Sequence, residues 1–153
     1  MDPENSQNLY SKARTLALRL LARSAKSSCE VKRRLLKADY PEDIADSVIE
    51  ELKEKNFVND ESFAKEWISR RFALKGLGRY RLGAELREKG LDPGLIERYL
   101  STIDDSDELE KALELAQKQK ERRDRNARQT AGFLKGRGFS CEIIQRAVRR
   151  VYQ

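Results

Sequence analysis

Two basic stretches hold the residues best suited to carry chemistry, and arginine dominates both. One extends from Arg70 to Lys89 around a turn, and the other from Lys118 to Arg128. A guanidinium group binds phosphate or carboxylate through paired hydrogen bonds, so the stretches predict an anionic partner. The alternative is a solvated helix face, which is the better interpretation for any single residue of the first stretch. The candidate partner-binding residues are Arg70, Arg71, Lys75, Arg79, Arg81, Lys118, Arg122, Arg123, Arg125, Arg128, Arg137, Arg149 and Arg150.

The turn inside the first stretch suggests a more specific anion site. Gly76 and Gly78 would leave backbone N–H groups accessible beside Arg79, which predicts a place for a phosphate or a carboxylate. Tyr80 follows directly and is flanked by two arginines. We expect a core position for this tyrosine, with stacking on a base or packing at a partner surface as the alternative.

The sequence lacks the residue patterns of catalytic and metal sites. Histidine, the usual proton-transfer group at neutral pH, does not occur. The two cysteines, Cys29 and Cys141, lack the paired spacing of a zinc or redox motif. The acidic residues from Asp104 to Glu110 fit helix capping better than a magnesium site, because no phosphate-binding or calcium-loop motif accompanies them. We therefore expect no enzymatic activity, no cofactor and no bound metal.

The charge distribution places the basic excess in the C-terminal third. The 153-residue chain has a net charge of +6, and residues 106–153 hold 12 basic against 7 acidic side chains. No apolar run approaches the roughly 20 residues of a membrane span, and the polar start, Met1 to Asn8, lacks the apolar centre of a signal peptide. These features predict a cytoplasmic protein whose C-terminal part meets an anionic partner.

Helices must position these residues, because apolar side chains recur at helical spacing and only 8 glycines and 3 prolines interrupt the chain. Ser27 and Glu30 have the spacing of a capping box, and Asn59-Asp60 can cap a later helix. Gly90 suits a helix end. The pattern predicts an all-α protein with about nine helices.

A period of about fifty residues groups the predicted helices into threes. We expect three three-helix modules, at residues 1–57, 58–104 and 105–153, with the last one basic. Because tandem modules pack mainly on their neighbours, we expect the array to be elongated and curved. Corresponding residues of the second helices are Leu35, Leu86 and Leu134, and on the leading helices Leu20, Trp67 and Leu115 are expected in phase.

Several short motifs follow one another in a distinctive order. They are Asn59-Asp60 with Phe63-Ala64, then Gly78 leading to Glu85-Leu86 and Lys89-Gly90-Leu91, and finally Gly138-Phe139. Through these motifs nearly the whole chain resembles the RecX family of bacterial recombinase regulators. The chain departs from the family at Asn59-Asp60, where two adjacent aspartates are common, and its third module matches more loosely.

The resemblance implies a specific partner and no chemistry of its own. Members of the family bind the RecA filament formed on single-stranded DNA, lodge in its groove, and restrain filament growth, ATP hydrolysis and strand exchange. For this chain the resemblance implies a monomeric regulator in recombination, DNA repair and the SOS response, with single-stranded DNA inside the filament as a further contact. The candidate arginines and lysines would then meet the filament or its DNA.

A second hypothesis comes from the residues themselves. Small three-helix units can pack as helix-turn-helix modules, and the C-terminal basic excess could supply phosphate contacts to duplex DNA. The chain would then be a direct DNA-binding regulator. Binding to duplex DNA with sequence preference, and without a recombinase, is the behaviour that separates this alternative from filament binding.

Overall fold

The computed structural model describes residues 2–153, and all regular secondary structure in this part of the chain is helical, with no β-strand. A π-helical turn, η1 (Arg71–Lys75), continues the fourth helix and was not predicted. The helices and the absence of strands in residues 2–153 confirm the predicted all-α class and repeated helix pattern. The nine α-helices within residues 2–153 are α1 (Pro3–Arg23), α2 (Ser28–Lys37), α3 (Glu42–Glu54), α4 (Asp60–Arg70), α5 (Arg79–Glu88), α6 (Pro93–Leu100), α7 (Asp105–Arg123), α8 (Ala127–Gly136) and α9 (Cys141–Val151).

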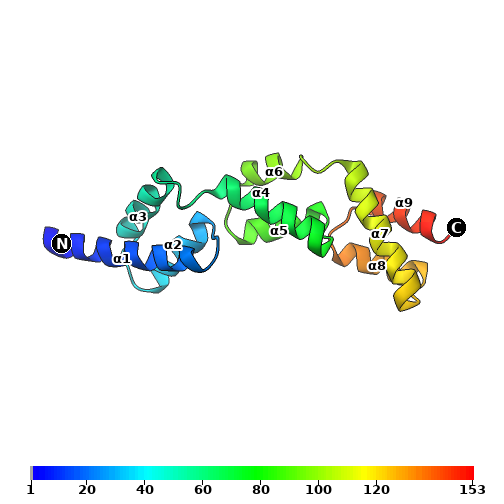
Figure 1. Cartoon of the computed structure of the whole chain (residues 1–153), viewed down its shortest axis with the longest axis horizontal. Coiled ribbons are helices and arrows are strands. Elements are labelled where there is room, and N and C mark those ends of the chain that lie inside the picture. Colours follow the sequence, from blue (N-terminus) through cyan, green and yellow to red (C-terminus); the bar gives the residue numbers. More distant parts are fainter. Residues whose placement is uncertain (1) are drawn as a thin grey trace. The chain divides into compact units, whose positions relative to one another are not determined.

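The helices form two compact units (Figure 1). The first unit contains the chain up to Phe63 together with the turn Lys89–Leu91. The second unit contains Ala64–Glu88 and Asp92–Gln153, so α5 to α9 belong to it. All the candidate partner-binding residues lie in the second unit.

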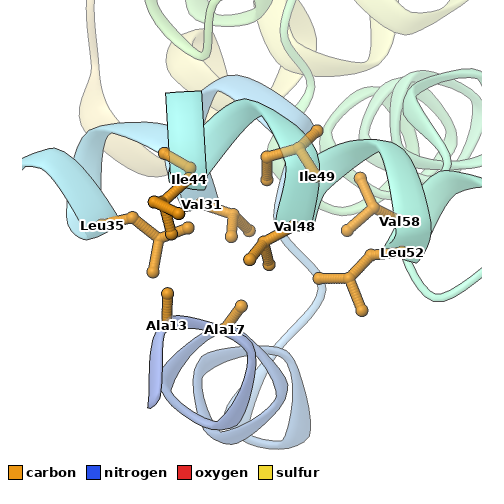
Figure 2. Close-up of a cluster of buried hydrophobic side chains, with 10 residues drawn as sticks. Ala13, Ala17, Val31, Leu35, Ile44, Val48, Ile49, Leu52 and Val58 are labelled. Carbon is orange, nitrogen blue, oxygen red and sulfur yellow. The ribbon is translucent and has the colours of Figure 1, made fainter. Parts of the chain in front are cut away.

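The core of the first unit forms where α1, α2 and α3 meet (Figure 2). Ala13 and Ala17 face the other two helices, and both are fully buried. Their small side chains let α1 approach the branched side chains of its neighbours closely, which excludes water from the interior. The remaining buried members of this core are Val31, Leu35, Ile44, Ala45, Val48, Ile49, Leu52 and Val58.

Polar caps fix where the second helix begins. The Ser27 side chain accepts a hydrogen bond from the Glu30 backbone N–H, and the Glu30 carboxylate accepts one from the Ser27 N–H, which confirms the predicted capping box. Asn59 caps its own helix by accepting from the Ser62 N–H at 3.0 Å. Asp60 contacts the first residue of α2 instead. Its carboxylate accepts hydrogen bonds from the Ser28 N–H at 2.8 Å and from the Ser28 hydroxyl at 2.6 Å.

The repeat is visible in the buried positions. Leu35, Leu86 and Leu134 are all fully buried, as their correspondence predicts. The expected phase of the leading helices is wrong at Leu20, because this residue does not precede its second-helix leucine by the same interval as Trp67 and Leu115 do. Leu16 has the interval of Trp67 and Leu115. The fully buried alanines Ala13, Ala64 and Ala112 of α1, α4 and α7 also repeat at equal intervals.

A close backbone contact joins α5 to the turn between α8 and α9. The Gly78 N–H donates to the Arg137 carbonyl at 2.8 Å, and the Tyr80 N–H donates to the Gly138 carbonyl at 3.1 Å. A Cβ at Gly78 would lie 2.5 Å from the Gly138 carbonyl oxygen, and one at Gly138 would collide with Arg81. Gly138 also has a φ of +91°, which favours glycine. Both glycines are therefore required for this contact.

Candidate partner-binding site

Four of the thirteen candidate side chains form ion pairs within the protein. Arg71 makes the most directed one, donating to both oxygens of Glu85 at 3.0 and 2.7 Å while its guanidinium lies 5.3 Å from the ring centre of Trp67. The hydrogen bonds with Glu85 raise the pKa of Arg71 above its ordinary value. This arginine therefore holds η1 against α5 and is a structural residue. The four pairs are Arg70–Glu66, Arg71–Glu85, Arg79–Asp105 and Lys118–Glu114.

Arg79, at the start of α5, lies among acidic residues at the start of α7. It pairs with Asp105 at 2.7 Å and with Glu108 at 3.1 Å, and it donates to the Ile103 carbonyl. Glu108 is only 2% exposed, and burial raises the pKa of its carboxyl against the opposing effect of Arg79. The acidic stretch at the start of α7 thus neutralises Arg79, a role that helix capping alone does not describe.

The predicted anion site at the glycine turn does not form. The N–H groups of Gly78 and Tyr80 already donate to carbonyls of the α8–α9 turn, and that of Gly76 donates to Phe72 at 3.2 Å. The turn does present these N–H groups, but carbonyl groups of the protein itself accept their hydrogen bonds. Sequence spacing could not reveal this partner, because it lies about sixty residues farther along the chain.

Three further candidate arginines contact backbone carbonyls or aromatic rings. Arg137 donates to the Lys75 carbonyl at 2.7 Å and lies 4.9 Å from the ring centre of Phe133. Arg125 lies 5.6 Å from the same ring. Arg81 reaches the Gly136 carbonyl at 3.4 Å, at the long end of hydrogen-bond distances. These guanidinium groups keep their charge at the surface while their positions are fixed by packing.

The other candidates are exposed and have no ion-pair partner among the residues that the structure describes. Five of these six come from three separate helix ends in the last segment of the chain, and Lys75 lies at the end of η1. The free candidates are Lys75, Arg122, Arg123, Arg128, Arg149 and Arg150.

Hydrogen bonds bring those three helix ends together. The Tyr152 hydroxyl donates to the Arg125 carbonyl at 2.6 Å and lies 2.7 Å from the hydroxyl of the buried Thr130. Lys120 donates to the Val151 carbonyl at 2.8 Å, which ties the end of α7 to the end of α9. The result is a cluster that we call the arginine end, composed of Arg122, Arg123, Arg128, Arg149 and Arg150.

A pocket of about 810 Å³ lies elsewhere in the second unit, lined by faces of α5, α6, α7 and α9. Tyr80 borders it and is 68% exposed, so the expected core position of this tyrosine is wrong. Two acidic residues of the lining, Glu97 and Glu142, were not identified from the sequence as candidates. The signal available for Glu142 is its spacing from Arg146, which places both side chains on one face of α9.

Other kinds of site find no support in residues 2–153. No helix in this part of the chain has the length and apolar character needed to cross a membrane. The same residues contain no group of three or more acidic, histidine or cysteine side chains placed to hold a metal ion. Cys29 is half-buried and Cys141 is exposed, and both are free thiols.

Comparison with known proteins identifies the family. The model of the second three-helix domain of RecX matches residues 59–100, and that of the first matches residues 13–52. The regulatory protein RecX of Mycolicibacterium vanbaalenii is 35% identical over 147 residues, which cover 96% of this chain and 77% of the relative. The chain belongs to the RecX family. The regulatory protein RecX of Streptomyces coelicolor is 32% identical over 146 residues, with 92% and 78% covered.

Solved RecX structures share this fold. The crystal structure of RecX from Lactobacillus salivarius superposes with a TM-score of 0.86 at 24% identity, covering 95% of this chain and 98% of the other. A second crystal structure of a regulatory protein RecX gives a TM-score of 0.84 at 20% identity, with 96% and 79% covered. Membership of the RecX family makes this chain a regulatory protein, as the names of its relatives state.

Proposed function

We propose that this RecX-family protein binds the RecA filament on single-stranded DNA and restrains filament growth, ATP hydrolysis and strand exchange. It acts by occupancy and contributes no catalytic residue. A protein that spans neighbouring protomers fixes their relative arrangement or blocks incoming subunits, which changes the filament equilibrium through differential binding. The proposal includes a cytoplasmic monomer with three three-helix modules at residues 1–57, 58–104 and 105–153, the last of them basic.

The arginine end is the observation that supports this proposal most. Five guanidinium groups are held at neighbouring helix ends without internal carboxylate partners, as an acidic protein surface or a phosphate backbone requires. Cations left unpaired at one place repel one another at low salt, and an anionic partner removes that repulsion. Most of the first basic stretch, by contrast, is occupied by internal ion pairs and carbonyl contacts.

The test is RecA's single-stranded-DNA-dependent ATP hydrolysis, followed together with filament length while the protein is titrated. We expect inhibition below one copy of this chain per RecA protomer. The double variants Arg122→Glu/Arg123→Glu and Arg149→Glu/Arg150→Glu should each raise the half-inhibitory concentration at least about tenfold, since each replaces two attractive charges by repulsive ones.

The matched control is Lys12→Glu/Arg19→Glu, which makes the same change in net charge on exposed residues of α1. This control should inhibit like the unchanged protein, and circular dichroism should show equal helix content for all variants. An unchanged half-inhibitory concentration in both charge-reversed variants of the arginine end would refute a role of this cluster in filament binding. A folded, unchanged protein without effect on hydrolysis or filament length would refute the proposed function.

A further inference from the structure

The pocket in the second unit combines groups that the proposed filament contact does not use. We propose that it binds a nucleotide, whose base stacks on Tyr80 while its phosphate meets Arg87 and Arg146. The nucleotide is either a unit of single-stranded DNA or a free one, since both present the same base and phosphate. The site forms within this chain alone, so the inference goes beyond binding to the filament.

The wall formed by α5 provides a surface for the base. Tyr80, Gly83 and Arg87 follow one another at helical spacing and line the pocket together. The ring of Tyr80 is 68% exposed at the edge of the pocket, so it is open to a ligand. Stacking of a base on such a ring contributes about 1–3 kcal/mol and accepts every base.

Gly83 keeps the pocket open beside that ring. A Cβ on this residue would lie 3.2 Å from Leu100 Cδ1 and 3.3 Å from Arg87 Nη1. The guanidinium of Arg87 therefore lies next to the space that the missing side chain leaves. Glycine is unfavourable inside a helix by roughly 1 kcal/mol relative to alanine, so its presence in α5 maintains this space at a cost in stability.

Two unpaired cations provide the phosphate contact. Arg87 on α5 and Arg146 on α9 both line the pocket, and neither has an ion-pair partner in the described part of the chain. Arg79 lines the same pocket but is neutralised by Asp105 and Glu108. The two free guanidinium groups are thus the available donors for phosphate oxygens.

The acidic part of the lining distinguishes a nucleotide from an acidic peptide. Glu97 and Glu142 border the pocket, and neither forms an ion pair within residues 2–153. An acidic peptide would place carboxylates against these carboxylates, whereas cytosine and adenine present amino groups that carboxylates accept. The volume of about 810 Å³ also falls within the range of roughly 300–1,000 Å³ found for small-molecule sites.

The experiment compares base-bearing and abasic strands. Fluorescence anisotropy measures binding of the full chain to a labelled oligodeoxycytidylate and to a deoxyribose-phosphate strand of the same length without bases, at one salt concentration. Tyr80→Ala should weaken binding of the first strand roughly tenfold or more and leave binding of the second unchanged, because only the stacked base is lost. Tyr80→Phe should bind like the unchanged protein.

Gly83→Ala tests the pocket without removing a functional side chain. Alanine suits the helix, but its methyl group occupies the space beside Arg87, so we expect the same selective loss as for Tyr80→Ala. Leu74→Ala is the control, since Leu74 is 77% exposed and does not line the pocket. Competition by free deoxycytidine monophosphate, lost in Tyr80→Ala, would identify a free nucleotide as ligand; competition by the oligonucleotide only would identify single-stranded DNA.

Equal binding of the base-bearing strand by Tyr80→Ala and unchanged protein would overturn the inference. So would an equal loss for the abasic strand, or Tyr80-dependent binding of an aspartate-rich peptide with no binding of nucleotides. RecA inhibition is measured separately. Intact inhibition without base-dependent binding would refute only the nucleotide site, and base-dependent binding without inhibition would refute only the proposed function.

Discussion

Glu108 shows how one buried carboxylate can organise a basic region. It is almost completely buried at the start of α7, where it pairs with Arg79 on α5. Burial raises its pKa, while the neighbouring arginine lowers it and Asp105 raises it further. Desolvation therefore outweighs the attraction of Arg79, so keeping this carboxylate charged in the pair costs free energy. This pair explains why Arg79, central in the basic stretch, is unavailable to a partner.

The raised pKa of Glu108 predicts a pH dependence of stability. Between the ordinary and the raised pKa the folded chain holds a proton on Glu108 that the unfolded chain has released, so stability from this residue falls as pH rises. Glu108→Gln removes this titration. We expect the free energy of unfolding of the unchanged protein, relative to that of Glu108→Gln, to decrease as the pH of urea titrations rises above the ordinary pKa of a glutamate.

The difference between the two proteins isolates Glu108 from other carboxylates. The pKa of Glu51 is lowered chiefly by its hydrogen bond with Lys55, and that of Glu114 chiefly by its hydrogen bond with Lys118. Their contributions to stability weaken as pH falls, but they cancel in the comparison because both proteins contain them. A difference that increases with pH would mean that Arg79 outweighs burial.

At the scale of elements, hydrogen bonds between helix ends set the shape of the arginine end. α7, α8 and α9 enclose a common core that includes Leu109, Leu134 and Ile143. Beyond this core, Tyr152 bridges the start of α8 and the residue Arg125 after α7. The Tyr152 hydroxyl, together with the bond from Lys120 to the Val151 carbonyl, therefore joins the helix ends that carry the free arginines.

Tyr152→Phe should weaken this junction. The substitution leaves the Thr130 hydroxyl and the Arg125 carbonyl without their partner, and Thr130 is fully buried. Loss of a partner by buried polar groups costs about 1–3 kcal/mol. We expect a decrease of this size in the free energy of unfolding, together with faster amide hydrogen exchange at the start of α8.

Tyr80→Phe is the matched substitution, because its hydroxyl belongs to an exposed side chain with no hydrogen bond in residues 2–153. The free energy of unfolding of Tyr80→Phe should stay within about 0.5 kcal/mol of that of the unchanged protein. Equal destabilisation by the two substitutions would show that the Tyr152 bonds contribute nothing particular.

The elements also show what a single sequence can and cannot predict. Helix class, the capping box and the Leu35, Leu86 and Leu134 repeat depend on local spacing, so they were predicted correctly. The phase of the leading helices was missed because Leu20 lies about one helical turn beyond Leu16, the residue that precedes Leu35 by the interval of Trp67 and Leu115. The buried alanines of these helices repeat as well. Alanine contributes by permitting close approach, and that is visible only when the facing helix is known.

The sequence predicted the residue types of the candidate site, but only partly which of those residues are unpaired and can contact a partner. Arginine at helix ends indicates an anionic partner, but Arg71 and Arg79 resemble Arg122 and Arg149 until their acidic neighbours are located. Those neighbours come from other helices, so the pairing depends on tertiary structure. The pocket beside Tyr80 depends on residues of four helices, and no sequence window contains it.

At the scale of the whole molecule, stability is divided among separate cores. Leu35 lies in the core of α1, α2 and α3, and Leu134 lies in that of α7, α8 and α9. Both side chains are fully buried. In repeat proteins each core depends mainly on its own helices and their immediate neighbours. Local unfolding of this chain should therefore follow the same division.

Leu35→Ala and Leu134→Ala test that division, since each should cost about 2–5 kcal/mol in its own core. Residue-resolved hydrogen exchange should show lost protection in α1 to α3 for the first variant and in α7 to α9 for the second. Leu36→Ala, at a position that is 39% exposed, should leave protection nearly unchanged. Uniform loss along the chain in both leucine variants would indicate one cooperative unit.

The contact between Gly78 and the α8–α9 turn also supplies a built-in reporter. Amide protons in turns ordinarily exchange with solvent quickly, but those of Gly78 and Tyr80 are bonded to the carbonyls of Arg137 and Gly138. Their exchange rates therefore follow the opening of this contact and little else. The exchange rates of these two amide protons, measured by NMR, can thus show whether a partner stabilises, weakens or does not affect the contact between α5 and the α8–α9 turn.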